Sequence, residues 1–246
     1  MPNEGKEAMI PLIKSTFYKE SLTKRKLTSF LKSTSILSLS KECIKFEKNF
    51  SNWQGRKYTI LVNSGSSANL AIIQSFLNLG KLKKGDKVGF SAVTWSTNVM
   101  PLLQLGLKPI PIDVELNTLN ISSLTLKKSL KKHKIKALFL TNLLGFCSDI
   151  EEIAKECKKN KIIFFEDNCE SLGTEYKGKK LGNFGLASTF SFYVGHHMST
   201  IEGGAICTDD EKLATMLSLV RAHGWGRNLE FLKQKELREK FKINSG

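Results

Sequence analysis

The segment from Ser191 to Gly204 contains the side chains best suited to proton chemistry. It reads Ser-Phe-Tyr-Val-Gly-His-His-Met-Ser-Thr-Ile-Glu-Gly-Gly and contains no lysine. An imidazole has a pKa near neutrality and moves protons at physiological pH, whereas a lysine amine could also form an imine with a carbonyl compound. The segment therefore predicts proton transfer by His196. Adjacent histidines without carboxylates at ligand spacing are poor metal ligands, so we expect no metal.

A second segment with chemical potential, Asn63-Ser-Gly-Ser-Ser-Ala-Asn-Leu70, stands between an apolar run and a helical pattern. Small residues at the start of a helix let backbone N–H groups face an anion, and serine hydroxyls add further donors. Gly65 and Ser66 are therefore candidate ligands of a phosphate group. A plain turn with a serine N-cap is the alternative explanation.

Two further candidates follow apolar runs that predict strands. Asp167 comes directly after such a run, and a carboxylate at the C-terminal end of a strand lies where α/β sheets bind ligands. There it could pair with a protonated ring nitrogen, or it could cap the next segment. Trp95 follows another predicted strand and could either stack on a flat ring or belong to the core.

The elements that must position these residues are short apolar runs alternating with amphipathic stretches. This alternation predicts an α/β domain with a mostly parallel sheet. The predicted strands span Tyr58–Val62, Lys87–Ser91, Lys108–Ile112, Ala137–Thr141, Ile162–Glu166, Ser188–Phe192 and Ala205–Thr208. The predicted helices cover Leu22–Leu31, the stretch from Cys43 to Trp53, Ser67–Leu79, Ser96–Leu105, Ile150–Lys159 and Asp209–His223.

Composition narrows the class of protein. The 246 residues are 41% hydrophobic and 25% charged, which is typical of a soluble globular protein. The net charge of +15 comes from lysines spread along the whole chain. That spread favours a solvated surface, or an anionic nucleotide-linked substrate, and we expect no nucleic acid and no membrane as partners. The five cysteines lack CxxC spacing, and the N-terminus lacks an apolar signal core, so we expect a cytoplasmic protein with reduced thiols.

Taken in chain order, the motifs resemble a known family. An anion loop, an aromatic residue, an aspartate after a strand, and a Ser…His segment before Glu-Gly-Gly resemble the DegT/DnrJ/EryC1/StrS sugar aminotransferases, from about Glu42 to Gly224. The resemblance implies the large domain of a fold-type I enzyme that uses pyridoxal 5'-phosphate, with a mostly parallel sheet of the seven-stranded type flanked by helices. Further matches are Phe46-Glu47, Gly85-Asp86, Pro111-Ile-Asp113, Asn142–Gly145, Gly173 and Arg221-Ala-His-Gly224.

The resemblance also implies how the cofactor would be held. Gly65, Ser66 and Ser191 fall on the positions that hold its phosphate. Trp95 falls on the position that stacks on its ring, and Asp167 falls on the position that pairs with the pyridine nitrogen.

Two remaining positions concern the reaction. Glu170 falls where the family has a polar residue near the ring hydroxyl, and His196 falls on the cofactor lysine. Histidine at that position resembles the 3-dehydratase branch, which uses pyridoxamine 5'-phosphate to remove the C3 hydroxyl of a nucleotide-linked 4-keto-6-deoxysugar. The Tyr193-Val-Gly-His-His pattern implies GDP-4-keto-6-deoxymannose as the substrate, with glutamate regenerating the cofactor. The product would enter dideoxysugar and O-antigen (lipopolysaccharide) biosynthesis.

Three alternatives to this function come from other branches or classes. An iron–sulfur branch that also carries histidine has cysteines beyond the position of Gly224, where this chain has none. An ordinary nucleotide-sugar aminotransferase would need a lysine from elsewhere. A catalytically silent cofactor-binding protein is the third alternative.

The resemblance divides the chain into three parts. Residues 1–40 would be an N-terminal arm, residues 41–228 the cofactor-binding large domain, and residues 229–246 the truncated start of a linker to an absent smaller C-terminal domain. Because fold-type I sites are usually shared between two subunits, we expect a homodimer.

Overall fold

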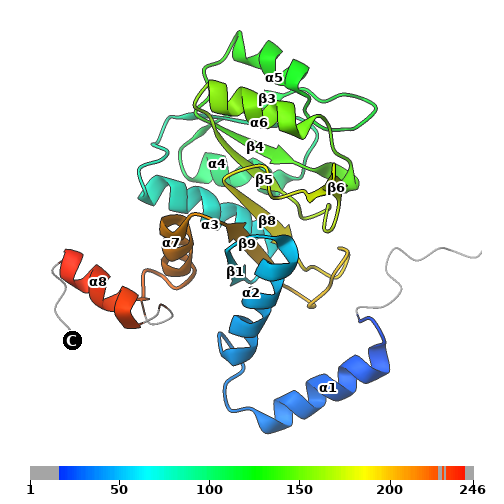
Figure 1. Ribbon diagram of the computed structural model, residues 1–246, viewed down its shortest axis with the longest axis vertical. Helices are drawn as coiled ribbons and strands as arrows, with labels where there is room; N and C mark the ends of the chain where they lie inside the picture. The colour runs from blue at the N-terminus through cyan, green and yellow to red at the C-terminus, as the bar shows by residue number, and fades with distance from the viewer. Residues whose placement is uncertain (1–16, 227–228, 230, 242–246) are drawn as a thin grey trace, which may run out of the picture.

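A single mixed sheet forms the centre of the fold (Figure 1). The computed structural model describes residues 17–226, 229 and 231–241. The strand order is β1-β9-β8-β5-β4-β2-β3, in which β9 runs antiparallel to both neighbours and the strands from β8 to β3 pair in parallel. This confirms the predicted mostly parallel, seven-stranded sheet. The strands are β1 (Tyr58–Val62), β2 (Lys87–Ser91), β3 (Lys108–Ile112), β4 (Ala137–Thr141), β5 (Ile163–Asp167), β8 (Ala187–Ser191) and β9 (Gly204–Thr208).

Helices cover both faces of the sheet because the central strands are apolar on both sides. In β4, Phe139 packs in one core cluster with α3, α4 and α7, whereas Leu138 and Leu140 pack in a second cluster with α5 and α6. Parallel strands buried on both faces have continuous apolar runs of this kind. These helices are α3 (Gly65–Asn78), α4 (Met100–Gln104), α5 (Ser123–Leu130), α6 (Ile150–Lys159) and α7 (Glu211–Arg221).

Helix α2 (Lys41–Gln54) packs against β1 and against the end of β8. Its Phe50 stands edge-on to Phe190 and Phe192, at the end of β8, with ring centroids 5.2 and 5.4 Å away. Helix α1 (Glu20–Ser33) has no buried residue and lies apart from the sheet (Figure 1). Helix α8 (Phe231–Phe241) follows α7. None of the helices in the described part of the chain is long and apolar enough to cross a membrane.

Several elements differ from the prediction. The predicted helix over residues 96–105 is divided into the 3-10 helix η1 (Ser96–Asn98) and α4, and Pro101, which lacks an N–H donor, occupies the first turn of α4. Helix α5 and the short pair β6 (Glu175–Tyr176) and β7 (Lys179–Lys180) were not predicted. They are too short to give a clear periodicity. Residues 1–16 of the predicted arm, 227–228 at the end of the predicted large domain, and 230 and 242–246 of the predicted linker lie outside the described residues.

Candidate active site

The candidate site lies at the ends of neighbouring strands. Asp167 is the last residue of β5 and Ser191 the last residue of β8, while Trp95 follows β2 and the Ser-Gly-Ser loop follows β1. Ligands of α/β sheets bind at the carboxyl ends of parallel strands, where loops from several strands converge. The fold therefore gathers at one edge residues that are far apart in the sequence.

Close packing joins the start of α3 to Ser191. A Cβ atom on Gly65 would lie 2.7 Å from the Cβ of Ser191 and 2.8 Å from the Sγ of Cys169. Only glycine therefore allows the helix to begin beside Ser191. The Oγ of Ser64 accepts a hydrogen bond from the N–H of Ser67 at 3.1 Å, so the serine N-cap alternative is correct as far as the turn is concerned.

The same helix start can also bind an anion. The first N–H groups of a helix have no carbonyl partner within it, and its dipole favours negative charge there. Ser66 is exposed and lies in this first turn, and the buried Ser191 accepts only a long hydrogen bond of 3.3 Å from the N–H of Tyr193. Both hydroxyls are thus available to an incoming phosphate.

His196 follows β8 in a half-buried position. The backbone N–H of His196 donates to the carbonyl of Tyr193 at 3.0 Å, and the imidazole ring packs edge-on to the Tyr193 ring. Its Nδ1 is buried and has no hydrogen-bond partner among the residues that the structure describes. Burial lowers the pKa of the imidazole below the usual 6.5, while the charges of Glu170 and Asp167 oppose this shift. At neutral pH the ring is therefore mainly uncharged and able to accept a proton.

Glu170 connects two loops beside the site. Its Oε2 accepts a hydrogen bond from the N–H of Leu144 at 3.1 Å. Leu144 has a left-handed backbone with φ of 52°, and Gly145 follows with φ of 78°. The carboxylate therefore stabilises the turn after β4 and also contributes negative charge near His196.

Trp95 is 71% exposed, so the alternative that it belongs to the core is wrong. An indole with a free face is available for stacking on a flat ring.

Asp167 has the most hydrogen bonds of the predicted residues. The carboxylate is 4% exposed; its Oδ2 accepts from the side-chain amides of Asn69 at 2.9 Å and Asn98 at 2.7 Å. Its Oδ1 accepts from the N–H of Cys169 at 2.9 Å, which is the local capping role considered as an alternative. Sequence reasoning did not find Asn69 or Asn98.

A sequence signal for Asn69 did exist. It occupies the apolar stripe of α3 together with Ile72, Ile73 and Phe76, all of which are fully buried. A side-chain amide in such a stripe requires a buried partner.

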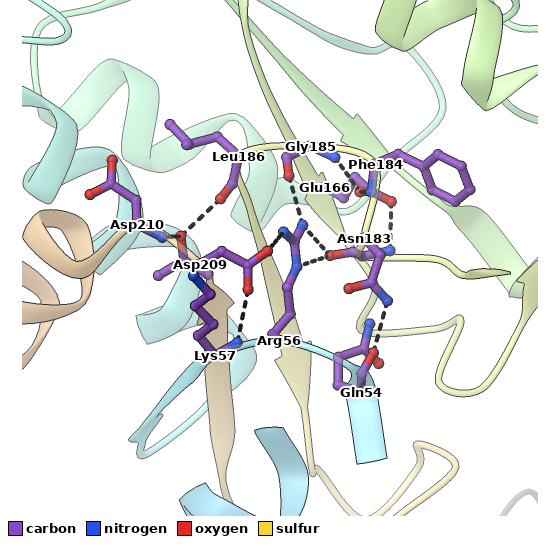
Figure 2. A network of polar contacts seen from close by, with 12 residues as sticks. Gln54, Arg56, Lys57, Glu166, Asn183, Phe184, Gly185, Leu186, Asp209 and Asp210 are labelled. Atoms are coloured by element: carbon purple, nitrogen blue, oxygen red, sulfur yellow. Dashed lines mark hydrogen bonds and ion pairs between the residues drawn. The ribbon is translucent and has the colours of Figure 1, made fainter. Parts of the chain in front are cut away.

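Figure 2 shows a second polar network, which includes Arg56 and Glu166. The Glu166 carboxylate accepts hydrogen bonds from the N–H groups of Gly182, Phe184 and Gly185 at 2.7–2.9 Å. Arg56 donates to the carbonyls of Gly182 and Gly185 and to Asp209. The network fixes the loop that leads into β8, and therefore fixes where Ser191 lies.

The donor set fits a cofactor with a phosphate, an aromatic ring and a basic ring nitrogen. The helix start and serine hydroxyls suit the phosphate, the exposed indole suits the ring face, and the buried carboxylate suits a protonated nitrogen. The unpartnered Nδ1 of His196 supplies a proton acceptor. Within the described residues, no group of three or more His, Cys, Asp or Glu side chains is arranged to hold a metal ion.

Comparison with known proteins identifies the family of the chain. The model of the DegT/DnrJ/EryC1/StrS aminotransferase family matches residues 18–245. The chain belongs to this family. The resemblance on which the site residues were predicted is thereby confirmed, although the role of each residue stays a prediction.

Two curated relatives of the chain bear the same name. GDP-4-keto-6-deoxy-D-mannose 3-dehydratase of Yersinia pseudotuberculosis is 42% identical over 198 residues, which are 80% of this chain and 50% of the relative. The enzyme of that name from Escherichia coli O55:H7 is 41% identical over 221 residues, which are 89% of this chain and 56% of the relative. The chain thus spans about half the length of the curated relatives it matches.

Solved structures of such an enzyme share the fold. The E. coli GDP-4-keto-6-deoxy-D-mannose-3-dehydratase with bound hydrated PLP superposes with a TM-score of 0.83 at 40% identity, over 89% of this chain and 56% of that one. A structure of GDP-4-keto-6-deoxymannose-3-dehydratase with a trapped PLP-glutamate geminal diamine gives the same values. A histidine-to-asparagine mutant, with bound GDP-perosamine, also has a TM-score of 0.83.

Proposed function

We propose that this chain is the cofactor-binding part of a 3-dehydratase that acts on a nucleotide-linked 4-keto-6-deoxysugar, GDP-4-keto-6-deoxymannose. The observation that carries the proposal is His196, a half-buried imidazole with a free ring nitrogen where an aminotransferase needs a lysine amine. Identity of 41–42% to enzymes of this name supports the choice of substrate. The product would serve dideoxysugar and O-antigen synthesis.

The cofactor would be pyridoxal 5'-phosphate in its pyridoxamine form. Gly65, Ser66 and Ser191 would hold the phosphate, Trp95 would cover the ring and Asp167 would keep the ring nitrogen protonated. Glu170 would lie near the ring hydroxyl, as the family resemblance implies. When bound, pyridoxamine phosphate supplies an amine that condenses with the keto group of the sugar and a ring that accepts electrons.

His196 would act as the base and acid of the reaction. Its neutral ring takes up a proton at a free nitrogen, and the resulting imidazolium is stabilised by the charges of Glu170 and Asp167. Because an imidazole cannot replace a lysine amine in releasing an aminated sugar, this residue favours loss of the C3 hydroxyl over transamination. Glutamate would restore the amine of the cofactor, and a relative trapped with PLP and glutamate supports this.

The proposal also includes a homodimer in the cytoplasm. Around η1 and α4, Trp95, Met100 and Leu103 are 71%, 48% and 52% exposed, and such a cluster of apolar side chains is typical of an interface. All five cysteines are free, which supports a reducing compartment. Light scattering of the purified chain tests the dimer, and a monomer at micromolar concentration would contradict it.

The function is tested with the purified chain, pyridoxamine 5'-phosphate, glutamate and GDP-4-keto-6-deoxymannose. We expect mass spectrometry and NMR to show loss of the C3 hydroxyl. A 4-amino sugar product would instead indicate an aminotransferase. A lysine adduct trapped by borohydride would contradict the role of His196, and failure to bind any cofactor would favour a silent protein.

A further inference from the structure

Asn69 occupies an energetically costly position in α3. It is fully buried beside apolar residues of the same helix, where a polar side chain is costly unless it is hydrogen-bonded. Both ends of its amide are hydrogen-bonded: Nδ2 donates to Asp167 Oδ2 at 2.9 Å, and Oδ1 accepts from the hydroxyl of Thr189 at 2.7 Å. Because an ionised carboxylate can only accept, the NH₂ end of the amide must face the aspartate, and the carbonyl end is left to accept from the threonine hydroxyl.

A second amide reaches the same carboxylate oxygen. Asn98, in η1, is also fully buried, and its Nδ2 lies 2.7 Å from Asp167 Oδ2. An ionised carboxylate oxygen has about two acceptor sites, so these two donors occupy Oδ2 completely. Oδ1 accepts one backbone hydrogen bond, from the N–H of Cys169 at 2.9 Å, and has a second acceptor site; the Cys169 thiol, a weak donor, also lies beside this carboxylate.

We propose that Asn69, Asn98 and Thr189 are positioning residues that turn Oδ1 of Asp167 toward the ring nitrogen of the cofactor. This inference rests on the proposed function and adds to it the residues that orient the aspartate. Two neutral amides hold the carboxylate in place without bringing in a positive charge that would compete with a protonated ring. Thr189 in β8 acts indirectly, because its hydroxyl donates to Asn69 Oδ1 and so orients the amide. The three residues come from α3, η1 and β8, so the orientation depends on how these elements pack.

The principal test compares Asn69→Leu and Thr189→Val with the unchanged chain. Pyridoxal 5'-phosphate is the probe, and its dissociation constant and absorption spectrum are the readouts, because the spectrum reports the protonation of the ring nitrogen. We expect Asn69→Leu to weaken binding about tenfold or more, the effect of losing a hydrogen bond to a charged group, and to change the spectrum. Thr189→Val should produce a smaller change of the same kind.

Two controls separate positioning from loss of packing. Thr189→Ser keeps the hydroxyl and should restore the binding and spectrum of the unchanged chain. Thr208→Val removes a buried hydroxyl in β9 that donates to Leu186 O and accepts from the N–H of Asp210, neither of which bonds to Asp167, and should leave both readouts unchanged. If Asn69→Leu and Thr189→Val bind the probe with unchanged affinity and spectrum, the inference is wrong. Thr189→Val is nearly isosteric and provides the test if Asn69→Leu does not fold.

A cofactor-free measurement separates this inference from the proposed function. In the ¹⁵N-labelled chain, Asp167→Leu should shift the side-chain amide signals of Asn69 and Asn98, whereas Glu175→Gln should not. Unchanged signals would overturn the inference. Shifted signals in a chain that binds no pyridoxal 5'-phosphate would contradict the proposed function and leave the orientation of Asp167 supported.

Discussion

At the scale of single residues, the chemistry depends on the state of one imidazole. A histidine at the end of β8 can exchange a proton but cannot form the covalent link of a lysine. Burial favours its neutral form, and the nearby charges of Glu170 and Asp167 stabilise the charged form that proton uptake creates. The side chain can therefore both accept a proton and donate it again.

Replacing His196 with asparagine should abolish most of the dehydration. General acid–base catalysis contributes about 10²–10⁴-fold, so we expect a loss of this size in kcat with little change in the affinity for pyridoxamine 5'-phosphate. Steady-state kinetics and a binding titration measure the two quantities. His197→Asn is the matched control, because that neighbouring histidine is exposed and has no assigned role. Equal losses in both variants would disprove a specific role for His196.

The protonation of His196 should depend on Glu170. NMR titration should give a pKa below 6.5 for His196, because burial disfavours the imidazolium. Since the neutral ring is the active form, activity should fall only as the pH drops through this lowered value. Glu170→Gln removes a charge that raises the pKa, so the pKa should move lower still. Glu175→Gln, a change on exposed β6, is the control, and an upward shift with Glu170→Gln would contradict the assignment.

At the scale of elements, the site depends on how closely α3 approaches the end of β8. The contact of Gly65 with Ser191 and Cys169 leaves no room for a side chain. Similarly, the two amides that bind Asp167 arrive from α3 and η1. The positions of the site residues therefore depend on a glycine at the start of α3 and on buried amides in α3 and η1.

A methyl group at Gly65 should separate these elements. Forcing an extra carbon into a packed contact costs about 1–3 kcal/mol, so we expect Gly65→Ala to lower the free energy of unfolding by this amount and to weaken binding of pyridoxamine 5'-phosphate. Urea denaturation and a binding titration provide the measurements. In Gly226→Ala the added carbon would meet nothing closer than 3.9 Å. That control should be nearly neutral, and equal effects of the two substitutions would refute the packing argument.

At the scale of the whole molecule, Arg56 and Glu166 join segments that are distant in the chain. Arg56, after α2, bonds to carbonyls more than 120 positions away, and Glu166 binds three backbone N–H groups of the same loop (Figure 2). The network connects the end of α2, the loop before β8 and Asp209 after β9. It holds together the half of the sheet that carries Ser191.

Arg56→Met should therefore reduce the stability of the whole fold. The Arg56 side chain is only 6% exposed, and its loss removes the donors to the partly buried carbonyls of Gly182 and Gly185. A hydrogen bond that involves a charged group contributes about 1.5–3 kcal/mol, and we expect a thermal or urea unfolding experiment to show a decrease of at least this size. Lys57→Met changes the exposed neighbouring cation and should alter stability by less than about 0.5 kcal/mol. A similar effect at both positions would mean that charge alone, and not the network, is responsible.

The seven strands of the main sheet could be predicted within one residue because the signal for each strand is local. Apolar runs such as Ala137–Thr141 are buried on both faces, and a short continuous apolar run is visible in the sequence without any knowledge of the neighbouring strands. The order of motifs, with histidine where a lysine is expected, also indicates the family from the sequence alone. Short elements such as α5 were not predicted because eight residues give little periodic signal.

The hydrogen-bond partners of the predicted residues are known only from the tertiary structure. Asn69 and Asp167 are 98 positions apart, and Arg56 and Gly182 are 126 apart, so no local pattern relates them. The sequence by itself determined the types of chemical group and the elements that carry them, since propensity and periodicity act over a few residues. Which donors meet the Asp167 carboxylate, and which oxygen they leave free, depends on the packing of α3 and η1 beside β5 and β8.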